Sequence, residues 1–151
     1  MSKVIAVTNQ KGGVGKTTTC AAFAGIFRKN GRSVLAVDLD PQGNLSFSLG
    51  AEDTGFTVHD VMKGRCSLEA AVKRTDICDV LTSNILLSGT ELELDGRDRE
   101  FVLKRALEQA QSKYDAIIID TPPALSILTI NAYTAADDLI TVSYTHLTLP
   151  T

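Results

Sequence analysis

Short apolar runs alternate along the chain with longer segments whose apolar residues recur at helical spacing. The runs at residues 4–8 (VIAVT), 33–37 (SVLAV) and 114–120 (YDAIIID) are rich in β-branched residues and predict buried strands. Helices are expected at residues 16–30, 58–63, 68–73, 100–112 and 126–135, and two further strands at 78–82 and 138–141. This alternation predicts an α/β fold, a mostly parallel sheet with helices on both faces.

Two stretches between these elements are expected to be irregular. Pro41, Gly43 and Gly50 punctuate residues 41–50, and the charge-rich sequence ELELDGRDRE at residues 91–100 is typical of a solvated surface turn. In a parallel α/β sheet, ligands bind at the carboxyl ends of the strands. Polar residues that follow the predicted strands are therefore the first candidates for a functional site.

Composition narrows the class of protein without identifying it. The chain has 151 residues, of which 44% are hydrophobic and 22% charged, so one globular domain is expected. A net charge of −3 gives no overall footprint for nucleic acid. No apolar run is long enough to span a bilayer, and the first ten residues do not resemble a signal peptide. The three cysteines form no CxxC pair and are expected to be reduced, partly buried thiols.

The sequence KGGVGKTTT at residues 11–19 joins the first strand to the first helix. It is a variant of the phosphate-binding loop, because the strict pattern has glycine where this chain has Gln10. Glycines let backbone N–H groups curve around phosphate oxygens, and the following helix points its positive end at the same place. Lys16 can supply charge to the β- and γ-phosphates, Thr17 can bind Mg²⁺ and Thr18 can bond a more inward phosphate. A tight glycine turn without function is the alternative, and the flanking strand and helix argue against it.

Three aspartates end predicted strands and are candidates for supporting a metal ion or a water molecule. Asp38 and Asp40 follow the second apolar run in the sequence DLDPQGN, and Asp120 closes the run IIID. A magnesium-dependent nucleotide hydrolase needs carboxylates to hold metal-bound water and to orient the attacking water. Ordinary turn and cap roles remain the alternative for all three. His59 is interpreted as a surface or cap histidine rather than a catalytic one.

Together these motifs resemble the deviant phosphate-loop ATPases of the ParA/Soj and MinD superfamily. The resemblance covers residues 1–140 and rests on KGGVGKTT, DLDPQGN and YDAIIIDTPPALSILTINA. The DPQGN element, the dipeptide Ser83-Asn84 and the TPP-L-T-NA pattern are most similar to the ParA/Soj partition branch. The cysteines that the nitrogenase iron-protein and iron–sulfur scaffold branches need are absent from the corresponding places. The resemblance implies a phosphate-loop NTPase fold and the cofactors ATP and Mg²⁺.

The resemblance also implies a role for each site residue. The loop would bind the nucleotide, and Lys16 would hold the β- and γ-phosphates. Asp40 would orient or activate the attacking water. Lys11 would act on the ATP of a partner subunit. Thr17 would bind Mg²⁺ directly, with Asp38 and Asp120 supporting it through water. The nucleotide-binding set implied by the resemblance is Lys11, Gly12, Gly13, Val14, Gly15, Lys16, Thr17 and Thr18.

A cross-subunit lysine makes hydrolysis depend on an ATP-dependent homodimer. The family resemblance further implies chromosome or plasmid segregation in the cytoplasm, on the nucleoid, with a ParB-like stimulating partner and non-specific DNA. Two alternatives stay open. A MinD-like membrane-associated positioning ATPase would carry an amphipathic C-terminal helix with lysines on its polar face. The chain could also be an inactive fragment of a ParA-like ATPase.

The last ten residues, VSYTHLTLPT at 142–151, depart from the family pattern. They resemble one reading frame through a transposase-adapter sequence used in DNA libraries. The expectation is therefore that residues 1–141 are the N-terminal part of a ParA-like ATPase domain and that 142–151 are not native. On this interpretation the fold is incomplete at its C-terminus, and the DNA-binding residues are missing from the chain.

Overall fold

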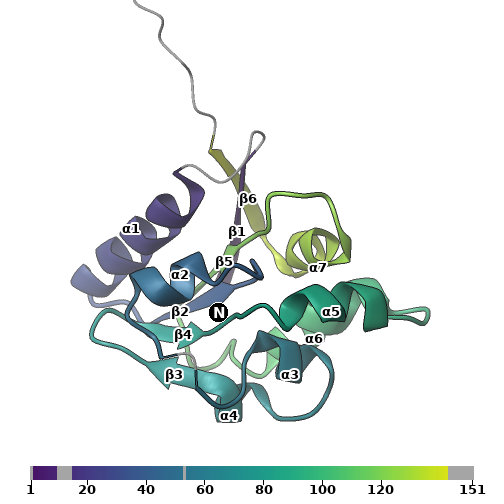
Figure 1. Ribbon diagram of the computed structural model, residues 1–151. Coiled ribbons are helices and arrows are strands. Elements are labelled where there is room, and N and C mark those ends of the chain that lie inside the picture. The colour runs from purple at the N-terminus through teal and green to yellow at the C-terminus, as the bar shows by residue number, and fades with distance from the viewer. Residues whose placement is uncertain (1, 10–14, 53, 143–151) are drawn as a thin grey trace, which may run out of the picture.

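The computed structural model describes residues 2–9, 15–52 and 54–142 and shows a sheet with helices on both faces (Figure 1). Within those residues the sheet has six strands in the order β3-β4-β2-β5-β1-β6. The strands are β1 (Lys3–Asn9), β2 (Val34–Asp38), β3 (Val72–Arg74), β4 (Asp79–Leu81), β5 (Ala116–Asp120) and β6 (Asp138–Val142). All pairings are parallel except that of β3 with β4, so the predicted mostly parallel sheet is confirmed.

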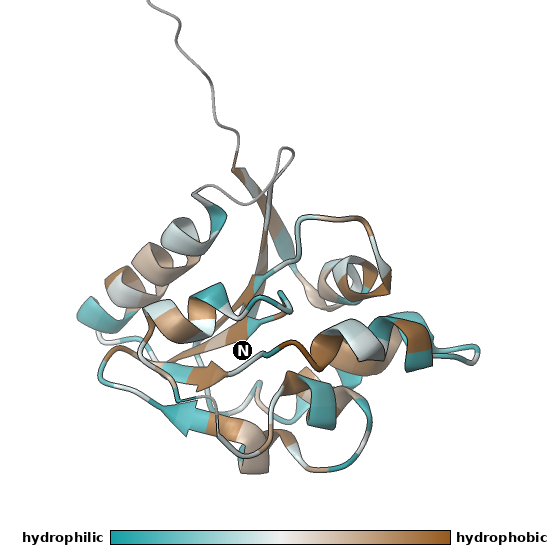
Figure 2. Ribbon diagram, in the orientation of Figure 1, coloured by the Kyte–Doolittle hydropathy of each residue, from teal (hydrophilic) through white to brown (hydrophobic). Residues whose placement is uncertain are grey.

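Helices cover both faces of this sheet. They are α1 (Lys16–Lys29), α2 (Asn44–Ser48), α3 (Val58–Met62), α4 (Leu68–Ala71), α5 (Leu87–Glu93), the 3₁₀ turn η1 (Arg99–Phe101), α6 (Val102–Glu108) and α7 (Ile127–Ala135). Buried side chains of α1 and α2 pack on one face, and those of α3 to α7 pack on the other. In Figure 2 the central strands carry the hydrophobic colours, whereas both ends of α1 are hydrophilic.

Buried side chains of the central strands belong alternately to the two faces of the sheet, because successive side chains of a strand point in opposite directions. Ile117 and Ile119 of β5 pack beneath α6 and α7, whereas Ile118 packs beneath α1. Every residue of β2 and of β5 is buried, as expected of strands covered on both faces. The apolar runs therefore predicted the centre of the sheet correctly.

Several predicted boundaries were wrong. Residues 44–48, expected to be irregular, form α2, because Leu45 and Leu49 are buried against the sheet. Residues 87–93 form the unpredicted helix α5, which takes in the first part of the expected surface turn. The second predicted short helix ends at Ala71, and the chain continues at once as β3.

Two longer elements are also shorter than predicted. The helix expected at 100–112 begins with the 3₁₀ turn η1, and α6 ends at Glu108. The strand expected from residue 114 begins at Ala116. Just before it, the Asp115 carboxylate accepts the Ser33 N–H over 2.9 Å. The expected adapter-like tail lies outside the described residues from 143 onward. Val142 itself ends β6, in register with Asn9.

Candidate functional site

Three parallel strands end together and bring the candidate residues to one edge of the sheet. In the ladder Asp120 of β5 lies beside Val7 of β1 and beside Asp38 of β2. The loop after β1 returns through Gly15, whose φ of +90° is a left-handed conformation that favours glycine, and α1 begins at the next residue. The carboxyl edge of the sheet therefore holds the start of α1 together with the predicted aspartates.

Lys16 lies at the centre of this arrangement, and its side chain is only 1% exposed. Its Nζ lies 2.7 Å from Oδ1 of Asp120 and 3.9 Å from Oδ2 of Asp40, and it donates a hydrogen bond to the Thr121 carbonyl. The hydroxyl of Thr17 donates to Oδ2 of Asp120 over 2.9 Å. Four residues predicted from three separate motifs, Lys16, Thr17, Asp40 and Asp120, thus meet in one cluster.

Asp38 lies one layer further back and is fully buried. Its Oδ1 accepts the Asp40 N–H at 3.1 Å, and its Oδ2 accepts both the N–H and the hydroxyl of Ser46, at 2.9 and 2.7 Å. The carboxylate is thus directed toward the loop after β2 and toward α2.

Burial governs the protonation of these carboxyl groups. Burial raises the pKa of Asp38 to about 6, although the hydrogen bonds from Ser46 oppose the shift. Burial also raises the pKa of Asp120, while Lys16 and Thr17 favour its charged form. The pKa of the Cys20 thiol, one turn along α1, is raised by burial and by the nearby Asp120, so this thiol is not an activated nucleophile.

Other predicted residues are less closely engaged. Thr18 lies on the exposed side of α1, so its predicted phosphate contact remains a prediction. Lys11, Gly12, Gly13 and Val14 lie outside the described residues. His59, expected at the surface, is buried on α3, where its Nδ1 is hydrogen-bonded to the hydroxyl of Thr90.

The oxygen atoms of the cluster suit Mg²⁺ as ligands, because this ion prefers oxygen and retains several waters. Thr17, Asp40 and Asp120 supply a hydroxyl and carboxylates. Within residues 2–9, 15–52 and 54–142, no group of three or more acidic, histidine or cysteine side chains is arranged to hold a metal by itself. A magnesium ion here would therefore complete its coordination with phosphate oxygens and water.

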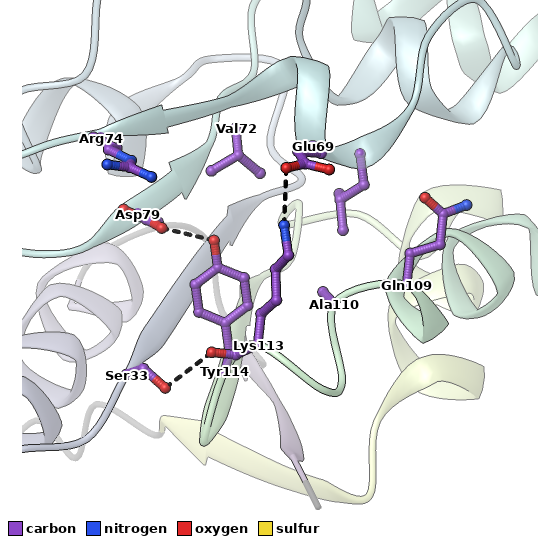
Figure 3. Close-up of a pocket in the computed structure, with 10 residues that line it drawn as sticks. Ser33, Glu69, Val72, Arg74, Asp79, Gln109, Ala110, Lys113 and Tyr114 are labelled. Atoms are coloured by element: carbon purple, nitrogen blue, oxygen red, sulfur yellow. Dashed lines mark hydrogen bonds and ion pairs between the residues drawn. The ribbon is translucent and has the colours of Figure 1, made fainter.

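A hollow of about 490 Å³ lies at the opposite, amino edge of the strands (Figure 3). It is lined by Ser33 before β2, Asp79 at the start of β4 and Tyr114 before β5. The Tyr114 hydroxyl donates to Asp79 over 2.7 Å, and Lys113 pairs with Glu69 at 3.0 Å. These contacts join neighbouring elements at the end of the sheet remote from Lys16, so the hollow is separate from the candidate site.

A mostly parallel α/β sheet, a glycine turn after its first strand and a buried lysine at the start of the next helix define a phosphate-loop NTPase. A family model described as an AAA domain matches residues 2–149, and the chain belongs to this family. Its relatives include Soj, the sporulation initiation inhibitor protein of Bacillus subtilis, 46% identical over 145 residues. The chromosome-partitioning ATPase Soj of Treponema pallidum is 40% identical over 142 residues. The resemblance to ParA/Soj-type ATPases is thus confirmed.

A solved structure from Mycobacterium smegmatis is also similar, with a TM-score of 0.90 and 47% identity. It is described as cobyrinic acid a,c-diamide synthase with a bound ATP analog and magnesium. These matches cover 92–93% of this chain, but only 57% and 56% of the two Soj proteins and 59% of the solved chain. The chain therefore spans somewhat more than half the length of these relatives. None of the helices in the part that the structure describes is long and apolar enough to cross a membrane.

Proposed function

We propose that this chain is the nucleotide-binding part of a partition-type ATPase, which binds ATP with Mg²⁺ and hydrolyses it. The observation that carries the proposal is the buried Lys16 ammonium at the start of α1, 2.7 Å from the Asp120 carboxylate at the carboxyl edge of the sheet. The name of the T. pallidum relative supports partition, and the solved structure with an ATP analog and magnesium supports the ligands.

Each residue of the cluster has a role in this proposal. Lys16 binds the β- and γ-phosphates, and Thr17 ligates the ion that Asp120 and Asp38 support through water. The ion supplies charge neutralisation on the phosphate oxygens. Asp40 accepts a hydrogen bond from the attacking water and orients it toward the terminal phosphate.

Residues 11–14, which lie outside the described residues, also belong to the proposed site. On the proposal, the loop residues from Lys11 to Val14 contribute to phosphate binding, and Lys11 acts on the ATP of a second copy in an ATP-dependent homodimer. The proposal extends to a ParB-like stimulating partner and to DNA in the cytoplasm, because the Soj relative of T. pallidum is named for chromosome partitioning. A MinD-like membrane ATPase is the weaker alternative, because that relative is named for partition.

ATP turnover by the purified chain tests the enzymatic part. The wild-type chain should release phosphate only with Mg²⁺, and Asp40→Ala should lower kcat by at least about 100-fold while ATP still binds. Asp76→Ala, at an exposed aspartate, is the matched control and should leave kcat unchanged. Binding of ATP without turnover in the wild-type chain would reject the enzymatic part and identify the chain as an inactive fragment that retains the ATP site.

Partition can then be separated from the activity named for the M. smegmatis structure. This test uses a protein of the relatives' full length, because the DNA-binding residues are expected to be missing from the 151-residue chain. A partition ATPase of that length should hydrolyse ATP faster when double-stranded DNA is added, and no corrinoid should change the rate. Stimulation by cobyrinic acid instead of DNA would overturn the proposed partition role.

A further inference from the structure

A closed ring of hydrogen bonds lies directly behind the candidate site. The Ser46 hydroxyl donates to Oδ2 of Asp38 and accepts the Ser83 N–H at 3.1 Å. The Ser83 hydroxyl in turn donates to the Asp40 carbonyl over 2.7 Å. The ring closes at Oδ1 of Asp38, which accepts the Asp40 N–H. It thereby joins the end of β2, helix α2 and the loop after β4.

The members of the ring are buried and closely packed. Ser46 is 6% exposed and Ser83 is 4% exposed, so solvent does not compete strongly for their hydrogen bonds. Gly43, between Asp40 and α2, has a φ of +69° and approaches the second loop closely. A Cβ there would lie 3.0 Å from the Ser83 carbonyl oxygen. The two loops are thus held against each other by backbone contact as well as by hydroxyl groups.

The ring fixes the backbone on both sides of Asp40 and so fixes its side chain. The Asp40 N–H and carbonyl are both bonded within the ring. Its Oδ1 accepts the Gln42 N–H at 3.0 Å, which leaves Oδ2 facing Lys16. Neither serine contacts Lys16, Thr17 or Asp120 among the interactions of the described residues. Their effect on the site therefore passes through the aspartates.

We propose that Ser46 and Ser83 are positioning residues for Asp40, because their ring of hydrogen bonds with Asp38 holds the Asp40 carboxylate toward Lys16. The inference rests on the proposed function, in which Asp40 orients the attacking water. It also assigns Asp38 a second task as the anionic acceptor of the ring. A carboxylate suits this place because its two oxygens take three donors.

Kinetics of ATP hydrolysis by the full chain test the positioning role. Ser46→Ala and Ser83→Ala should each lower kcat about 10-fold with KM for ATP changed less than 2-fold, because displacement of a catalytic group by a fraction of an ångström slows the chemical step. The double variant should be no more than about 2-fold slower than the worse single variant, since either substitution opens the same ring. Ser48→Ala, an exposed serine of the same helix, is the control and should retain the wild-type kcat. Unchanged kcat in both single variants, or losses that multiply in the double variant, would overturn the inference while the ATPase proposal stands.

Amide hydrogen exchange on the ¹⁵N-labelled chain tests the ring without relying on turnover. In Ser46→Ala the Ser83 amide loses its acceptor and should exchange at least about 10-fold faster. The Asp40 amide, which Ser46 does not contact, should also exchange faster, while the Ile130 amide in α7 should not change. Acceleration at Ser83 alone would show a local hydrogen bond and reject the positioning role. A wild-type chain without turnover but with coupled exchange would reject the ATPase proposal and retain the ring.

Discussion

Replacement of Lys16 by alanine should destabilise the protein strongly even without nucleotide. Its ammonium and the Asp120 carboxylate are 1% and 0% exposed and lie 2.7 Å apart. At an effective dielectric constant of about 20, this separation corresponds to an attraction of about 6 kcal/mol before the cost of desolvation. Removal of one partner from such a buried pair costs about 3–5 kcal/mol, because the remaining charge is buried without compensation. We expect Lys16→Ala to lower the free energy of unfolding by that amount at pH 8.

The loss should depend on pH in a definite direction. Burial already raises the pKa of Asp120 in the presence of Lys16, and removal of the lysine raises it further. A carboxyl group whose pKa is higher in the folded chain than in the unfolded chain binds a proton first in the folded chain. Its contribution to stability therefore falls as pH rises from the usual aspartate range through the folded pKa. The difference between Lys16→Ala and wild type should be largest at pH 8 and smaller at pH 5.

Urea unfolding followed by far-UV circular dichroism measures these differences, since the chain has no tryptophan. Lys29→Ala, at an exposed lysine in the last turn of the same helix, is the control and should cost less than about 1 kcal/mol. Lys16→Ala combined with Asp120→Asn should recover at least about 1 kcal/mol at pH 8, because the buried charge is gone. A Lys16→Ala protein as stable as the Lys29→Ala protein at pH 8 would refute the argument. An equal loss at pH 5 and pH 8 would assign the effect to packing instead of charge.

Three further predictions concern residues outside the charged cluster. Gly43→Ala should lower the free energy of unfolding by about 1 kcal/mol more than Gly50→Ala, measured by urea unfolding. Both glycines have positive φ, but only a Cβ at Gly43 meets a neighbouring carbonyl oxygen. Tyr114→Phe should cost about 1 kcal/mol in thermal unfolding, because it removes the hydrogen bond to the carboxylate on β4. Cys66 should react with a thiol reagent at pH 8 in the native protein, whereas Cys20, which is fully buried, should react only after unfolding.

The centre of the fold is predictable because its signal is local. The strands β2 and β5 are buried on both faces, so each appears in the sequence as an uninterrupted apolar run. The start of α1 is equally clear, since the glycine loop before it leads into a long segment of helical spacing. These elements can be recognised without knowing their distant partners, and their order along the chain already implies parallel pairing.

The peripheral elements depend on contacts that the local sequence does not contain. The helices α2 and α5 have five and seven residues, too short to be stable alone. Leu45 and Leu87 are fully buried against the rest of the protein, and this burial stabilises the helices where local propensity cannot. The short strand β3 likewise exists through its antiparallel pairing with β4.

The candidate site also has a part that the sequence predicts and a part that depends on distant contacts. The phosphate loop and the three aspartates follow predicted strands directly, so their presence at one edge could be inferred from topology. The family resemblance includes Ser83 but gives it no role, and nothing in the sequence pairs it with Ser46, because the hydrogen bond between them spans 37 residues. The Thr121 carbonyl that accepts from Lys16 lies 105 residues away from it. Such partners can be found only when the folded chain brings them together.

The buried charges at this edge are better explained by function than by stability. Lys16, Asp38, Asp40 and Asp120 are each less than 10% exposed and lie within one connected set of contacts. A buried ion pair contributes little net stability, because desolvation of both groups offsets their attraction, and apolar residues of similar volume often serve as well. Selection for stability alone would therefore not require four charged groups at the carboxyl ends of β2 and β5. A site that must bind phosphate and a divalent cation requires both signs of charge in a dry place, and it requires them where the loop after β1 meets the two aspartate-bearing strands.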